Sequence, residues 1–132
     1  MSVTKESTTN TVSILLVEDT PVQAMRFKNS LEGEGCSIRW VENGLEGVEA
    51  AHNGYFDLII LDIELPDIDG FEVCRRLKAD PSVADIPVIM LTTRDRAEDA
   101  LTGLGRGAID YIPKDSFAEI VLLETLKQMG LL

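Results

Sequence analysis

The chain has few cysteines, a single histidine and no long apolar run, and each shortage argues against a class of protein. The two cysteines, Cys36 and Cys74, lie inside apolar stretches, which predicts buried, reduced thiols rather than a disulfide. The lone His52 cannot join a second imidazole in a metal site, and its position predicts an exposed helix end. No apolar run approaches the roughly 20 residues that span a bilayer. The polar N-terminus lacks a signal-peptide core, so we expect a cytoplasmic protein without a membrane segment.

Basic residues are also scarce, with 12 Lys and Arg against 23 Asp and Glu, for a net charge of −11. Such a chain is repelled by polyanions, so direct binding to nucleic acid is not expected. Most of this charge serves solubility, and a few of the acids would suffice for a cation pocket. The length of 132 residues, 45% of them hydrophobic, suits one folded domain. We expect residues 1–12 to form a disordered tail and residues 13–132 to form the domain.

Five short apolar runs, built mostly from branched side chains, predict five β-strands. They are Ile14–Val17, Cys36–Val41, Leu58–Leu61, Val88–Leu91 and Ile109–Ile112. Beyond each run, a polar residue is followed three positions later by Glu or Gln, the spacing of a helix capping box or a close variant. The pairs are Thr20 with Gln23, Asn43 with Glu46, Asp69 with Glu72, Asp95 with Glu98, and Ser116 with Glu119. Five alternating units predict an α/β fold with an open, doubly wound parallel sheet.

Acidic, hydroxyl and basic side chains stand where these strands end. Glu18 and Asp19 follow the first strand, Asp62 the third, Thr92 the fourth and Lys114 the fifth. Because such sheets bind ligands outside the carboxyl ends of their strands, we expect these side chains to share one pocket. Crowded carboxylates favour a divalent cation such as Mg²⁺, which keeps open positions for phosphate oxygens. An aspartate can then act as a nucleophile and become an aspartyl phosphate.

At these residues the chain resembles a response-regulator receiver domain, the CheY-like, aspartate-phosphorylated part of two-component signalling. The resemblance covers about Ser13 to Met129 and is carried by ILLVEDTP, LIILDIELPDIDGFEVCRRLK, PVIMLTT and GAIDYIPK. It implies a flavodoxin-like, five-stranded (βα)5 fold with the strand order 2-1-3-4-5. It also implies a phosphoacceptor domain that catalyses only its own phosphorylation and dephosphorylation.

The resemblance further implies a role for each residue at the strand ends. Asp62 would be the phosphoacceptor, Lys114 would bind the carboxylate and then the phosphate, and Thr92 would turn toward the phosphoryl group. Tyr111 would change rotamer with Thr92, so that the two form the conformational switch. Mg²⁺, or Mn²⁺ in its place, would be bound by Glu18, Asp19, Asp62 and the backbone carbonyl of Glu64.

The chain departs from the family pattern after the fifth strand. The family usually has Lys-Pro there with a cis peptide, whereas this chain has Pro113-Lys114-Asp115, which leaves the conformation of the peptide after Lys114 open. A proline inside that strand predicts an edge strand. Gly103, Gly105 and Gly107 predict a short fourth helix. We also hypothesise that Glu64 and Arg94 pair across the pocket and restrict attacking water, against the alternative of two independent solvated side chains.

These features predict a receiver that accepts a phosphoryl group from a histidine kinase or phosphotransfer protein and controls a downstream protein or effector domain. A stand-alone regulator and one domain of a longer protein both remain open. The last helix is apolar on more than one face, which leaves two interpretations open. One is a homodimer or partner surface through the helices after the fourth and fifth strands, and the other is core packing with scattered surface apolar residues. A dehalogenase-type phosphatase would have Asp where Glu64 stands, and a flavin carrier would need a phosphate loop where Glu18 and Asp19 stand.

Overall fold

The computed structural model describes residues 11–93 and 107–132, and its centre is one five-stranded parallel sheet. The strands are β1 (Ser13–Val17), β2 (Ser37–Val41), β3 (Leu58–Asp62), β4 (Val88–Thr92) and β5 (Asp110–Pro113). Their order is β2-β1-β3-β4-β5, so that β2 and β5 lie at the edges. The predicted fold class and strand order are confirmed, and each predicted strand agrees with the observed one to within one residue at either end.

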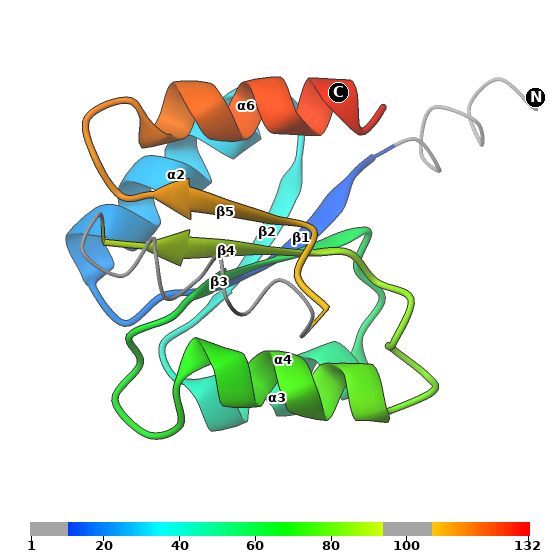
Figure 1. Cartoon of the computed structure of the whole chain (residues 1–132). Helices are drawn as coiled ribbons and strands as arrows, with labels where there is room; N and C mark the ends of the chain where they lie inside the picture. The colour runs from blue at the N-terminus through cyan, green and yellow to red at the C-terminus, as the bar shows by residue number, and fades with distance from the viewer. Residues whose placement is uncertain (1–10, 94–106) are drawn as a thin grey trace, which may run out of the picture.

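Helices cover both faces of the sheet in a three-layer arrangement (Figure 1). The described helices are α2 (Pro21–Gly33), α3 (Gly44–Asn53), α4 (Gly70–Ala79) and α6 (Ala118–Gln128). α2 and α6 lie on one face, and α3 and α4 lie on the other. The helix and the glycines Gly103 and Gly105 predicted after the fourth strand fall outside the described residues, as does most of the predicted N-terminal tail. None of the helices within the described ranges has the length and apolar character of a membrane span.

Two apolar clusters hold these layers together, because successive side chains of a buried strand point to opposite faces. Leu15, Ile59 and Leu61 point toward α3 and α4, where they pack with Val73 and Leu77. The alternate residues of the same strands point toward α2 and α6 and pack in the second cluster: Ile14, Leu16, Leu58 and Ile60 with Ala24, Phe27, Leu122 and Leu126. Since β1 and β3 are buried on both faces, the residues at their carboxyl ends are attached to a rigid backbone.

The predicted helix starts are confirmed with their side-chain caps at α3 and α4, the start of α2 is confirmed without the cap, and the start of α6 is wrong. Asn43 and Asp69 accept hydrogen bonds from the backbone N–H groups three residues later, at 2.8 and 2.9 Å. Thr20 stands directly before α2 but makes no side-chain cap, and Pro21 occupies the first turn, where a proline is well tolerated. Ser116 does not cap α6, because that helix begins only at Ala118 and has no side-chain cap from Phe117. The cap predicted at Asp95 lies outside the described residues.

Several smaller predictions are confirmed. Cys36 and Cys74 are buried. His52 is exposed at the end of α3, where its Nδ1 lies 2.8 Å from a carboxylate oxygen of Asp80. Pro113 lies in the edge strand β5, where the missing N–H leaves no gap in the sheet interior.

Candidate functional site

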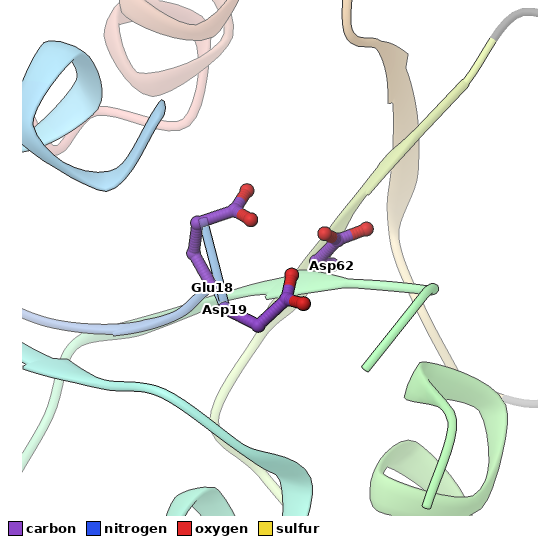
Figure 2. A group of neighbouring side chains, drawn as sticks. All are labelled: Glu18, Asp19 and Asp62. Carbon is purple, nitrogen blue, oxygen red and sulfur yellow. The ribbon is translucent and has the colours of Figure 1, made fainter. Parts of the chain in front are cut away.

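Three carboxylates meet at the carboxyl ends of β1 and β3. Glu18, Asp19 and Asp62 each offer an oxygen within 4.8 Å of the others. Figure 2 shows the three side chains facing one space beyond the strand ends. Glu18 and Asp62 are buried, whereas Asp19 is exposed. Because one carboxylate is exposed and the other two are buried, an ion could reach the group from the solvent on the side of Asp19.

The parallel pairing of β1 with β3 explains why residues 44 positions apart meet here. Val17 is in register with Leu61, so the next residues, Glu18 just after β1 and Asp62 at the end of β3, lie side by side. The strands themselves are fixed by their apolar burial. The apolar residues before Asp62 therefore have a clear consequence: their burial fixes the Asp62 carboxylate at the carboxyl edge of the sheet.

Lys114 completes the group from the neighbouring β5 connection. Its Nζ lies 2.7 Å from Asp62 Oδ2 in a hydrogen-bonded ion pair and 2.9 Å from Glu18 Oε1 in a second ion pair. Its backbone N–H donates to the Thr92 carbonyl at 2.6 Å, which fixes the lysine beside β4. The Lys114–Asp115 peptide is trans. One ammonium is thus shared by two buried carboxylates.

Burial controls the charge balance of this group. It raises the pKa of Glu18 to about 7, with a further rise from the Asp62 charge, and Lys114 opposes this only in part. For Lys114, burial alone would lower the pKa, but its contacts with Asp62 and Glu18 outweigh that effect and raise it. The ammonium therefore stays charged at neutral pH, while Glu18 stands near its titration midpoint.

Backbone N–H groups fix the remaining carboxylate oxygens. Thr20 N–H donates to Glu18 Oε2, and Glu64 N–H donates to Asp62 Oδ1, each at 3.1 Å. On the edge strand, the indole N–H of Trp40 donates to the backbone carbonyl of Glu18 at 2.7 Å. Sequence reasoning assigned no role to Trp40, because a tryptophan in a strand shows no sign of where its N–H will point.

The loop after Asp62 is tied to α3 by Asp67. Its two carboxylate oxygens each accept a hydrogen bond of 2.8 Å, from Gly44 N–H and Leu45 N–H at the start of that helix. Desolvation opposes these bonds, but they lower the pKa of Asp67 overall. Asp67 thus caps α3, and Asp69 caps its own helix, α4.

The same loop packs closely at its other end. A Cβ added to Gly70 would lie 2.5 Å from the Asp62 carbonyl oxygen and 2.8 Å from Ile63 Cα, so that only glycine fits without moving the backbone. Gly70 N–H also donates to the Ile63 carbonyl at 2.8 Å. The stretch of chain from Asp62 to Gly70 is therefore fixed at both of its ends.

The predicted switch residues lie on β4 and β5. Thr92 is buried at the end of β4, and its hydroxyl donates to the carbonyl of Thr93, its exposed neighbour, at 3.2 Å. Tyr111 is half-buried and packs against the cluster under α3 and α4. Since Met90 of β4 belongs to that cluster, alternation along the strand places the Thr92 side chain on the same face as Tyr111.

The structure also locates the other residues that the sequence singled out. The Glu64 side chain is exposed, and Arg94 lies outside the described residues, so their pairing stays a hypothesis. Along α6, Ala118, Leu122 and Leu126 are buried in the core. Ile120 and Val121 are 61% and 42% exposed, so the helix presents apolar side chains on its outer face as well.

The donor set fits a hard divalent cation. Oxygen ligands from one or two carboxylates, with positions left open for water and phosphate, are what Mg²⁺ prefers. Glu18, Asp19 and Asp62 lie together, and of these three Lys114 pairs with Glu18 and Asp62. Burial, and then the charge of Asp62, raise the pKa of Glu18, which shows that its charged form lacks full compensation. A divalent cation beside Asp19 would correct it. The arrangement is an acidic pocket with a rigid aspartate and an adjacent lysine, next to the strand β4 that ends in the buried Thr92.

Comparisons with known proteins agree with this geometry. The family described as "Response regulator receiver domain" matches residues 14–127. The uncharacterized transcriptional regulatory protein YkoG of Bacillus subtilis is 46% identical over 120 residues, which are 89% of this chain and 52% of that protein. The chain thus spans about half the length of this relative.

Solved structures share the fold, and one of them holds a metal ion. The chemotaxis response regulator CheY4 of Vibrio cholerae is 27% identical, with a TM-score of 0.82 over 92% of this chain and 99% of that one. The receiver domain of the sensor histidine kinase PA1611 of Pseudomonas aeruginosa PAO1 is 30% identical, with a TM-score of 0.80 over 89% and 96%. That structure has a magnesium ion coordinated in its active-site cleft.

Proposed function

This chain belongs to the response regulator receiver domain family, and we propose that Asp62 accepts a phosphoryl group in a magnesium-dependent reaction. The donor is a histidine kinase or a phosphotransfer protein. The observation that carries the proposal is the cluster of Glu18, Asp19 and Asp62 at the strand ends, with Lys114 bonded to two of the three. The domain comprises residues 13–132 and acts as a phosphoacceptor rather than a turnover enzyme.

The chemistry assigned to Asp62 is an in-line displacement at phosphorus. An oxygen of the carboxylate forms a bond to phosphorus while the bond from phosphorus to the donor atom breaks, and the leaving group takes the bonding electrons. Lys114, which holds the carboxylate in place before transfer, then pairs with an oxygen of the transferred phosphoryl group. Rigid placement of Asp62 at the end of β3 supplies the orientation that such a transfer needs.

Metal binding is assigned to Glu18, Asp19, Asp62 and the backbone carbonyl of Glu64, with Mn²⁺ as an alternative to Mg²⁺. When bound, the cation neutralises the charge on the phosphoryl oxygens. The exposed carboxylate of Asp19 supports direct binding of the cation by this residue. Glu18, buried and bonded to Thr20 N–H, acts from the inner side.

The switch is assigned to Thr92 and Tyr111. The Thr92 hydroxyl leaves the Thr93 carbonyl and donates to the phosphoryl group, and Tyr111 follows to fill the space on the same face of the sheet. A single 3.2 Å hydrogen bond to a neighbouring carbonyl is a weak restraint, which supports a hydroxyl that changes partner.

Output passes through protein contacts in the cytoplasm, to a downstream protein or an effector domain. The negative net charge of the chain supports a domain that does not itself bind nucleic acid. The exposed apolar residues Ile120 and Val121 of α6 support a homodimer that involves this helix.

The test uses a small phosphodonor, acetyl phosphate, with intact-protein mass spectrometry. The wild-type protein should gain one phosphoryl group in the presence of Mg²⁺ and none in excess chelator, and Asp62→Asn should gain none under either condition. Asp69→Asn is the matched control, because it changes a nearby exposed acid that lies in a helix cap. Uptake by Asp62→Asn at the wild-type rate would refute the proposal, and multiple turnover of small phosphate esters would favour the phosphatase alternative.

A further inference from the structure

The tryptophan at position 40 makes a contact that the proposed chemistry does not use. Its indole N–H donates to the Glu18 backbone carbonyl at 2.7 Å, across 22 residues of sequence. The ring lies half-buried on the α2 and α6 face of the edge strand, packed against the cluster that includes Leu16 and Phe27. Trp40 is thus held on one side by the core and bonded on the other to the metal-site backbone.

The carbonyl that accepts this bond has a special position in the chain. It belongs to the peptide between Glu18 and Asp19, the two acids of the first strand end. Both β1 and β2 end one residue earlier in register, at Val17 and Val41, and the last backbone bond between them runs from Glu18 N–H to the Val41 carbonyl. Beyond that bond, the sheet no longer fixes the orientation of the peptide.

We propose that Trp40 is a positioning residue for the cation site, because its indole N–H fixes the peptide plane between Glu18 and Asp19. That plane sets the directions in which the two side chains leave the backbone, inward for Glu18 and outward for Asp19. An ordered peptide lets both carboxylates approach a bound cation without further loss of backbone freedom. The inference rests on the proposed metal site and adds a residue of the edge strand to it.

The consequence is a measurable link between the edge strand and cation affinity. Partners outside the ligand shell that orient the ligands typically change metal affinity by about 10- to 100-fold when they are removed. Trp40 acts through the backbone rather than on a ligand atom, so we expect the lower end of that range, about 10-fold. Its emission should also respond to Mg²⁺, since the hydrogen-bonded carbonyl lies one residue from Asp19.

The composition of the chain allows an unusually specific test. Trp40 is the only tryptophan, so growth on an analogue replaces it at that position alone. Benzothienylalanine has nearly the shape of tryptophan but carries sulfur in place of the indole N–H, which removes the donor and keeps the packing. Mg²⁺ affinity, measured by calorimetry, should fall about 10-fold in this protein and equally in Trp40→Phe.

Ile38→Ala is the matched control, because Ile38 lies on the same strand and face and packs against the same cluster. It removes packing and leaves the indole bond, so its Mg²⁺ affinity should equal that of the wild type. Equal Mg²⁺ affinity in the benzothienyl and wild-type proteins would overturn the inference, as would an equal loss in Ile38→Ala.

A second measurement separates this inference from the proposed function. In metal-free protein, the Thr20 amide donates to Glu18 Oε2, and its hydrogen exchange should accelerate in the benzothienyl protein and not in Ile38→Ala. Absence of Mg²⁺ binding by the wild type would refute the metal-dependent function, while the exchange result still decides whether Trp40 fixes this turn. Unchanged exchange at Thr20 would overturn the positioning role.

Discussion

The acidic side of the pocket and its hydroxyl side hold their polar groups in different ways. On the acidic side, the carboxylates of Glu18 and Asp62 are bonded to Lys114 and to backbone N–H groups, and the loop after Asp62 is fixed by Asp67 and Gly70. On the hydroxyl side, Thr92 donates one 3.2 Å bond to its neighbour's carbonyl.

The difference follows from what each group requires when it is buried. A carboxylate removed from water is unfavourable unless charge and hydrogen bonds surround it, so its partners must already be in place. A hydroxyl needs only one modest hydrogen bond and can change partner by rotating about χ1. The acidic side is thus suited to binding a cation with little rearrangement, and the hydroxyl side is suited to moving after phosphorylation.

The largest effect should come from Lys114→Met, which removes the ammonium shared by Glu18 and Asp62. Breaking a buried ion pair by removing one partner costs about 3 kcal/mol or more, because the remaining charge is left uncompensated. We therefore expect a loss of about that size in the free energy of unfolding at pH 8, measured with denaturant in chelator. Mg²⁺ should restore part of it by supplying positive charge.

Lys127→Met is the control, because the ion pair that Lys127 forms within the described residues is an exposed one with Glu124 on α6. It should change stability little. An equal effect of the two substitutions would mean that the acidic side is not held by charge, and the comparison between the two sides would lose its basis.

The next largest effect is a pH dependence that comes from Glu18. Its folded-state pKa is raised from 4.5 to about 7, so between these values the folded protein binds more protons than the unfolded chain. Glu18 therefore lowers stability as pH rises through this window, by at most about 3 kcal/mol in metal-free protein. Glu18→Gln should remove this contribution.

The measurement is the difference in unfolding free energy between wild type and Glu18→Gln at several pH values in chelator. Taking the difference cancels the contributions of the other acids. Some of these have lowered pKa values and therefore make the unfolding free energy rise with pH. The variant should gain relative to the wild type between pH 4.5 and about 7 and stay parallel to it above that. If the stability difference did not change with pH across this window, the pKa of Glu18 would not be raised in the folded protein.

A smaller effect is expected for Asp67→Asn, which weakens the hydrogen bonds between the loop after Asp62 and the start of α3. Loss of a charged acceptor at a helix N-terminus costs about 1 kcal/mol. Because the folded pKa of Asp67 is lowered, its contribution is present above the unfolded pKa and is lost as pH falls through the folded value. The loss should therefore appear at pH 7 and shrink in acid, whereas Asp85→Asn, at an exposed position, should show neither change.

How much of this the sequence predicts depends on the range of each interaction. The strands were predicted to within a residue because uninterrupted apolar runs such as Leu58–Leu61 are typical of strands buried on both faces. The position of the site could then be predicted because the carboxyl ends of parallel strands lie at the same edge of the sheet. The predicted side-chain caps failed at Thr20 and Ser116, because capping depends on backbone path as well as on residue type. Near Ser116, the chain takes another turn in which Phe117 N–H donates to Asp115 Oδ1.

The supports of the site were not predictable from any local pattern. Trp40 and Asp67 each bond to a segment 22 residues or more away, and nothing in the spacing of the sequence indicates those partners. From the sequence, a tryptophan on an edge strand is interpreted as a packing residue, and an acid in a loop is interpreted as a solvated side chain. Both assignments change only when the register of β1 with β2 and the approach of α3 to the loop are known.

The smallest expected effect on stability, Thr92→Val, tests the hydroxyl side directly. Valine keeps the shape and removes one hydrogen bond of 3.2 Å, so the unphosphorylated protein should lose no more than about 1 kcal/mol. If the hydroxyl moves to the phosphoryl group, the same change should weaken the extra stability that beryllofluoride and Mg²⁺ confer on the wild type. Thr93→Val, at an exposed neighbour, should leave that extra stability intact. A Thr92→Val protein that is strongly destabilised before phosphorylation, yet responds to beryllofluoride as the wild type does, would place the fixed part of the pocket on the hydroxyl side and reverse the comparison.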